Sequence, residues 1–235
     1  MEYSLKEDVI LSVRLFGSRA RGDAEECSDT DILCVLDAVT DDVKTAVSEL
    51  VYKDIGKDVS ISFYGRERFS EMFAEGHLFA WHIFRESRFL HGFIASDWME
   101  TLGEPGPYID AIWDVRELAE IMATVPENLM NCPANAIYEG GLLYLCMRNI
   151  AMSLSWYSQK GLNFSRFAPL ELSEPFPEFP MNPNRYSSYM RCRLASTRGL
   201  AIGQIDAKKI SSDVQLCLDW TSRCVKILEN HEAAL

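Results

Sequence analysis

The chain has 235 residues, 48% of them hydrophobic, and is therefore long enough to bury one large core or two smaller ones. Its formal net charge of −12 argues against a nucleic-acid binder that is held by phosphate neutralisation. The first 100 residues carry 11 basic and 20 acidic side chains, a balance of −9, so most of the acidity lies there. This distribution favours metal ions and cationic partners over polyanions.

Cysteine usage and hydropathy indicate a cytoplasmic protein. The seven cysteines include no C-x-x-C pair, and Cys34 and Cys146 lie in apolar runs, as reduced thiols do in the cytosol. The first ten residues, MEYSLKEDVI, lack the basic start and apolar core of a signal peptide. No segment approaches the roughly 18 uninterrupted apolar residues of a membrane span, so we expect no membrane partner.

The first elements, taken in chain order, alternate between strands and helices. Ser4 and Glu7 have the spacing of a capping box for a short first turn. The run ILSVRLF at 10–16 is rich in aliphatic and β-branched residues and predicts a strand. A short helix is expected at 18–21, followed by a small, acidic loop at 22–28.

Two further strands are expected, with a helix between them. Residues 31–36 form a nearly continuous apolar run, which is typical of a strand covered on both faces. An amphipathic helix is expected from Asp41 or Asp42 to about Tyr52. The run DVSISFY at 58–64 alternates strictly, so this strand has one apolar and one polar face.

The stretch from Leu15 to Asp37, LFGSRARGDAEECSDTDILCVLD, combines a glycine-serine turn, two arginines and two carboxylates one residue apart. Gly17 and Ser18 directly follow an apolar strand, so their backbone N–H groups and the hydroxyl can approach phosphate oxygens. Asp29 and Asp31 are expected to project from one strand face, where they repel each other unless a cation lies between them. Mg²⁺ is the expected cation, because it binds few carboxylates and keeps water and substrate phosphates as its other ligands.

Asp58 adds a third carboxylate to this centre if the strand at 58–64 lies beside the strand at 31–36. The alternative is an acidic residue exposed at the end of a strand, where aspartate is common. The glycine-serine turn and the D-x-D pair that precede Asp58 favour the first interpretation.

These residues resemble a known family. The order G-S, then D-x-D, then a further Asp on an alternating strand, as at 17–18, 29–31 and 58, is similar to the nucleotidyltransferase superfamily that includes DNA polymerase β. The sequence LFGSRARGDA most resembles the small prokaryotic branch of this superfamily, which includes minimal and aminoglycoside (kanamycin-type) nucleotidyltransferases. The resemblance covers residues 9–64, and no element of the motif is missing.

The resemblance implies transfer of a nucleoside monophosphate from a nucleoside triphosphate, with AMP from ATP as the expected case. Gly17 and Ser18 would hold the triphosphate. Asp29, Asp31 and Asp58 would bind two Mg²⁺ ions, and Asp58 would help to deprotonate the acceptor hydroxyl. Two metals suit this in-line reaction, because one activates the attacking oxygen and the other stabilises the leaving pyrophosphate.

Charged side chains around this motif have more than one interpretation. Arg19 and Arg21 are candidate phosphate ligands, because the forked guanidinium matches phosphate geometry. The alternative is that both are solvated helix residues that neutralise acidic neighbours. Glu86 is expected to be a solvated helix acid, with a substrate contact as its alternative.

The histidines that follow the motif do not predict a metal site. His77, His82 and His91 are separated by five and nine residues, and these gaps fit no single ligand face of a helix. We therefore expect packing or interface roles for them.

The break TLGEPGP at 101–107 is the best domain boundary. We expect an α+β fold, in which a small mixed-sheet nucleotidyltransferase domain at 1–100 precedes an all-α helical-bundle domain at 101–235. Four helices are expected in the second domain, near 109–125, 134–159, 187–202 and 206–229, with Asp206 as the N-cap of the last. An apolar stripe is expected along the last helix, at Ile210, Val214, Cys217, Thr221, Cys224 and Leu228. The segment 168–185 holds five of the nine prolines and is expected to stay extended without a core of its own.

The second of these helices carries Glu139 and Arg148 among apolar residues. Buried charges need partners or a wet cleft. Kanamycin-type enzymes place a carboxylate base on their helical domain, so the resemblance makes Glu139 the candidate catalytic base. The local alternatives are an ion pair with Arg148 and the preference of acids for helix starts.

Three functions remain open. The first is transfer onto a hydroxyl of a small, cationic, aminoglycoside-like acceptor, a reaction of antibiotic resistance that the acidic charge favours. The second is transfer onto a protein or the 3′ end of tRNA in a toxin–antitoxin-type system, and the net charge weakens the tRNA version. The third is a non-catalytic, antitoxin-like module that only binds the nucleotide. Many relatives dimerise, and a homodimer is expected by that analogy alone.

Overall fold

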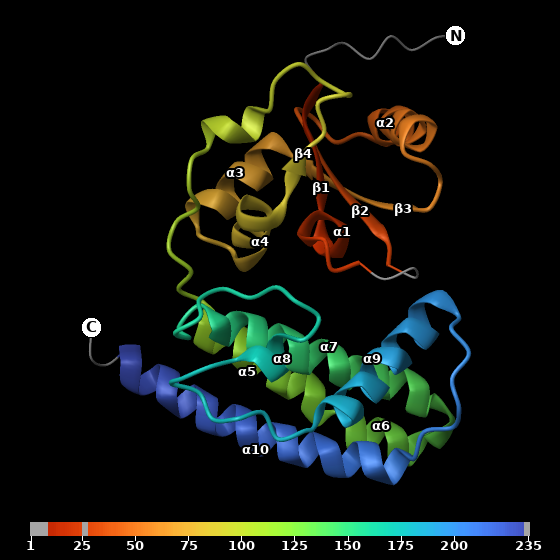
Figure 1. The fold of residues 1–235 in the computed structure, drawn as a ribbon, viewed down its shortest axis with the longest axis vertical. Coiled ribbons are helices and arrows are strands. Elements are labelled where there is room, and N and C mark those ends of the chain that lie inside the picture. Colours follow the sequence, from red (N-terminus) through yellow and green to blue (C-terminus); the bar gives the residue numbers. More distant parts are fainter. Residues whose placement is uncertain (1–8, 25–27, 233–235) are drawn as a thin grey trace. The chain divides into compact units, whose positions relative to one another are not determined.

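The computed structural model describes residues 9–24 and 28–232 and divides into two compact units, 1–109 and 110–235 (Figure 1). The division follows Ile109, later than the break at 101–107, because the chain beyond residue 97 still packs on the first unit. Met99 is buried in its core, and Trp81 donates to the carbonyl oxygen of Gly106 at 2.8 Å. The capping box expected at Ser4 and Glu7 lies outside the described residues.

The first unit is built on a four-stranded mixed sheet with the order β3-β2-β1-β4. The strands are β1 (Ile10–Phe16), β2 (Thr30–Leu36), β3 (Val59–Gly65) and the two-residue β4 (Arg88–Phe89). β1 is antiparallel to β2 and β4, whereas β2 and β3 are parallel. The expected mixed sheet is confirmed.

Helices cover both faces of this sheet (Figure 1). They are α1 (Gly17–Arg21), α2 (Asp41–Asp54), α3 (Arg66–Ala74), α4 (Leu78–Glu86) and the 3-10 helix η1 (Trp98–Thr101). In β2, Ile32 and Cys34 belong to the core under α2, while Leu33 and Val35 belong to the core under α3 and α4. All four side chains are fully buried, which confirms the strand predicted to be covered on both sides.

The regular secondary structure described in the second unit consists of helices alone. It contains α5 (Ala111–Ala123), α6 (Val125–Asn131), the 3-10 helix η2 (Pro133–Asn135), α7 (Ala136–Ser155), α8 (Ala168–Glu171), α9 (Pro183–Arg198) and α10 (Ala207–Glu232). The four expected helices correspond to α5, α7, α9 and α10. A helical unit after a mixed sheet confirms the α+β fold class.

Close helix packing organises the second unit. A Cβ atom on Gly140 of α7 would lie 3.0 Å from Sγ of Cys192, so glycine lets α7 and α9 approach each other. Asp206 accepts the backbone N–H of Lys208 at 2.9 Å, which confirms its capping role at α10. The expected apolar stripe of α10 is buried, with side chains at Ile210, Val214, Cys217, Thr221, Cys224 and Leu228.

The proline-rich segment at 168–185 is not extended throughout, because α8 and the start of α9 lie within it, and the part between these helices packs on the helical core. Phe176, Phe179 and Met181 are buried, and Phe179 packs edge-on against Trp220 at 5.2 Å and against Tyr186 at 5.7 Å. The segment joins the helical core, because its prolines are interleaved with large apolar side chains that are worth burying.

Two properties of the chain follow from burial and length. The thiols at 34, 146, 192, 217 and 224 are free and buried, and burial raises the pKa of Cys34 and Cys217 to about 12. Every helix in the part of the chain that the structure describes is too short or too polar to cross a bilayer.

Candidate active site

The first strand ends in a turn that needs glycine. Gly17 follows Phe16 directly and has φ 71°, a left-handed backbone conformation that other residues rarely adopt. A Cβ atom on Gly17 would lie 2.5 Å from Oδ2 of Asp31, well inside van der Waals contact. The backbone of the turn therefore lies directly against the Asp31 carboxylate, and α1 begins at this contact.

Asp29 and Asp58 immediately precede the neighbouring strands β2 and β3. β2 and β3 are parallel, and Asp31 lies opposite Ser60. The paired residues begin at Thr30 and Val59, so Asp29 and Asp58 each stand one position before this first pair. Because side chains alternate along a strand, Asp31 shares the sheet face of Leu33 and Val35, which packs against α3 and α4.

The three carboxylates are accessible rather than enclosed. Asp29 and Asp58 are exposed, and Asp31 is half-buried. Within the described ranges, no three His, Cys, Asp or Glu side chains are close enough to form a ready-made metal cage. The oxygen-only donor set nevertheless fits Mg²⁺, which takes one or two carboxylates and completes its shell with water and substrate phosphates.

The two arginines of α1 have different partners. Arg19 is exposed, and its Nη2 donates to the carbonyl oxygen of Ser28 at 2.9 Å, which ties α1 to the segment before β2. Arg21 forms ion pairs with Glu86 at 2.9 Å and with Asp23 at 3.3 Å. Arg21 therefore links α1 to α4, whereas the five-donor guanidinium of Arg19 retains N–H groups for a phosphate.

Glu86 is not the solvated acid that the sequence indicated. Its side chain is 18% exposed, and Oε2 lies 2.9 Å from Nη1 of Arg21 and 3.2 Å from Nε2 of His82. Burial raises the pKa of Glu86, but the hydrogen bonds and charges of His82 and Arg21 outweigh burial and hold the pKa below its ordinary value. His82 also packs edge-on against Phe16, which confirms a packing role for this histidine.

Glu139 lies in the first turn of α7, in the second unit. It is 3% exposed, and its Oε2 accepts no hydrogen bond from any residue that the structure describes. Arg148 donates to the carbonyl oxygens of Phe164 at 2.9 Å and Ser165 at 3.3 Å, so its hydrogen bonds hold the segment after α7. A buried carboxylate oxygen of this kind is costly unless another group supplies a donor.

The sequence matches the nucleotidyltransferase domain family over residues 2–87, which contain the turn and all three aspartates. The chain carries a nucleotidyltransferase domain. Among solved structures, the spectinomycin adenyltransferase AAD(9) from Enterococcus faecialis, with ATP and spectinomycin, is similar over 93% of this chain and 92% of that chain, at 11% identity and a TM-score of 0.48. No curated protein sequence matches this chain.

Two contacts of the nucleotidyltransferase domain were missed by sequence reasoning. One is the ion pair between Arg21 and Glu86, and the other is the packing of Phe16 on α4. The only local signal was the four-residue spacing of His82 and Glu86, which places both on one helix face. Neither residue indicates α1 as its partner, because Arg21 precedes Glu86 by 65 positions.

Proposed function

We propose that the protein transfers a nucleoside monophosphate, AMP from ATP, onto a hydroxyl of a small cationic acceptor, with Mg²⁺ as cofactor. The observation that carries the proposal is the contact of Gly17 with the Asp31 carboxylate. It places the backbone of the turn, which we assign to the phosphates, beside a carboxylate that we assign to the metal. The nucleotidyltransferase domain supplies the reaction class.

Each residue of the first unit has a role in this proposal. Asp29, Asp31 and Asp58 hold the metal ions, which activate the attacking oxygen and stabilise the leaving pyrophosphate. The backbone N–H groups of Gly17 and Ser18, with the Ser18 hydroxyl, hold phosphate oxygens.

Arg19 and Arg21, the two candidate phosphate ligands of α1, have different roles in this proposal. We assign Arg19 to the triphosphate, because it is exposed and retains donors. Arg21 contributes charge to the site, but two carboxylates already share its guanidinium.

The acceptor class rests on charge. The net charge of −12 favours a cationic acceptor such as an aminoglycoside and disfavours a polyanion such as tRNA. Glu139 is the proposed general base for the acceptor hydroxyl, because its buried Oε2 lacks a donor among the described residues and a hydroxyl would supply one.

The direct test is a transfer assay. The purified protein is incubated with Mg²⁺ and each of ATP, GTP, CTP and UTP, labelled on the α-phosphate, with a panel of aminoglycosides. We expect labelled aminoglycoside, with ATP as the preferred donor, and no product from a variant with Asp29→Asn and Asp31→Asn. If a protein or RNA of a cell lysate is labelled and the small acceptors are not, the acceptor is a macromolecule and the proposed acceptor class is wrong. Nucleotide binding without any transfer would reject the enzyme in favour of a binding module.

A further inference from the structure

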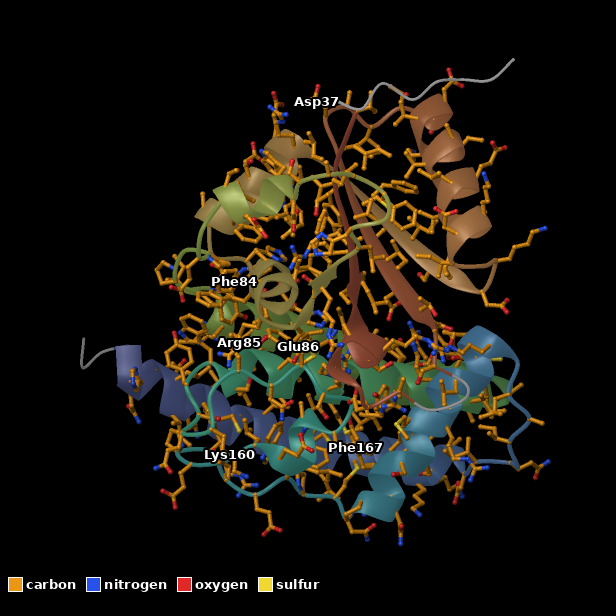
Figure 2. All side chains as sticks on the ribbon, turned by 45° about the horizontal axis from the view of Figure 1, so that its top comes forward. Asp37, Phe84, Arg85, Glu86, Lys160 and Phe167 are labelled. Atoms are coloured by element: carbon orange, nitrogen blue, oxygen red, sulfur yellow. The ribbon has the colours of Figure 1, made fainter. Side chains whose placement is uncertain are left out.

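We propose that Glu86 is a positioning residue for the nucleotide, which holds α1 and the glycine-serine turn in place from α4. This inference rests on the proposed function and adds to it a role for a residue outside the motif. Figure 2 labels Glu86 at the end of α4, with Phe84 and Arg85 before it.

An ion pair holds the end of α1. Arg21 is the last residue of α1, and Gly22 ends the helix with φ 86°. Nη1 of Arg21 lies 2.9 Å from Oε2 of Glu86, and the two side chains are 16% and 18% exposed. An ion pair that is largely shielded from water holds its geometry better than a surface pair, since breaking it leaves a poorly solvated charge.

An aromatic contact holds the chain just before α1. Phe16, the residue before Gly17, packs edge-on against Phe79 at 5.9 Å and against His82 at 5.8 Å, both from α4. α4 therefore contacts the chain on both sides of the glycine-serine turn, at the last residue of β1 and at the last residue of α1. A helix of five residues is not stable alone, so its orientation depends on such contacts.

His82 links these two contacts. His82 lies one turn before Glu86 on α4, and its Nε2 is 3.2 Å from the same Oε2 that Arg21 contacts. The imidazole thus touches both Phe16 and Glu86. Arg21 and His82 together fix one orientation of the Glu86 carboxylate, and that orientation fixes the end of α1.

The position of α1 sets the space beside the Asp31 carboxylate. The distance of 2.5 Å between Asp31 Oδ2 and a Cβ built on Gly17 shows that the turn has no room to move toward the carboxylate. A small rotation of α1 changes the space between the Gly17 backbone and Asp31, where phosphate and metal would bind. Misplacement of such groups by about 1 Å can cost on the order of 100-fold in rate.

The experiment compares Glu86→Gln with Glu71→Gln. Glu71 pairs with Arg68 on the exposed surface of α3 and is the matched control. The affinity for Mg·ATP is measured by calorimetry, kcat and KM for ATP and the acceptor by transfer assay, and Tm by melting. We expect Glu86→Gln to lower kcat/KM for ATP by about 10- to 100-fold while KM for the acceptor stays constant. Glu71→Gln is expected to match the wild type.

A double-mutant cycle separates positioning from direct substrate contact. If Glu86 acts through Arg21, the double variant Arg21→Ala with Glu86→Ala loses no more ATP affinity than the worse single variant. Additive losses, or an unchanged affinity in Glu86→Gln, would overturn the inference. Glu86→Asp is expected to recover part of the affinity because it keeps the charge. A wild type that binds no nucleotide would overturn the proposed function as well, whereas equal binding by wild type and Glu86→Gln overturns the positioning role alone.

Discussion

Gly17 and Asp31 are in direct contact across the β1–β2 pair: a Cβ atom on Gly17 would come within 2.5 Å of the aspartate Oδ2. This contact joins the two halves of the motif, which residues 22–29 separate in the sequence. It also makes the glycine necessary for two reasons, its positive φ and the space that the carboxylate occupies.

Gly17→Ala tests that contact. Alanine at a left-handed position costs about 1–3 kcal/mol of strain, and here the methyl group would also displace Asp31. We expect loss of nucleotide transfer together with a lower free energy of unfolding in urea. Gly161→Ala is the matched control, because Gly161 has φ 74° but open space around its Cβ position. The control should show the strain and keep its activity; equal activity in both variants would contradict the account.

Asp58→Asn tests the third carboxylate. Asp58 and Asp29 immediately precede the first paired residues of β3 and β2, and both are proposed metal ligands. Asp58→Asn should therefore weaken metal binding by more than about 10–100-fold, which is the loss caused by changes to residues behind the metal ligands. Mn²⁺ titration followed by electron paramagnetic resonance measures this affinity. Asp54→Asn, at the exposed end of α2, is the control. An unchanged Mn²⁺ affinity in Asp58→Asn would support the alternative of an exposed strand-end acid.

Asp213→Ala tests the packing of the second unit. Asp213 is fully buried, pairs with Arg185 and accepts the Tyr189 hydroxyl at 2.6 Å. Removing the carboxylate leaves a largely shielded guanidinium without its partner, so we expect a loss of about 3–5 kcal/mol in the free energy of unfolding. Asp219→Ala, on the exposed side of α10, should stay within about 0.5 kcal/mol of the wild type. Similar losses in both variants would contradict this role.

The free energy of unfolding should depend on pH through Glu86. Its pKa in the folded protein lies below the ordinary value of 4.5, so the folded state binds the proton less readily than the unfolded state. The stabilisation is therefore complete above pH 4.5 and is lost as the pH falls through the folded pKa. The charged neighbours that set this pKa are Arg21 and His82, and Asp23 contacts the same Arg21.

Urea unfolding of wild type and Glu86→Gln at several pH values measures this dependence. The difference in unfolding free energy between the two proteins should be constant near neutral pH and shrink below pH 4.5. A difference that grows as the pH falls would have the opposite sign and contradict the assignment.

The sequence predicted those features that depend on local pattern. The apolar run of β2 predicted burial on both faces, and the stripe of α10 predicted its buried side, because each follows from the period of one element. The order of the aspartates and the turn also followed from the motif. The parallel pairing of β2 with β3, in which Asp31 lies opposite Ser60, could be seen only in the structure.

The features that escaped prediction depend on distant parts of the chain. Glu86 is largely shielded because Arg21, far away in sequence, meets it. Phe179 is buried because Trp220 and Tyr186 enclose it, and the proline-rich pattern predicted only an extended segment without a core of its own. Such contacts have no local period, and only the folded chain specifies them.

The most direct test of the central claim is titration of ATP into the protein by calorimetry, with and without Mg²⁺, for the wild type and for Asp31→Asn. The account predicts tight binding to the wild type that depends on Mg²⁺, and a large loss of this metal-dependent affinity in Asp31→Asn, because the carboxylate beside Gly17 joins metal and phosphate. Equal ATP affinity in both proteins, or affinity that is independent of Mg²⁺, would contradict it.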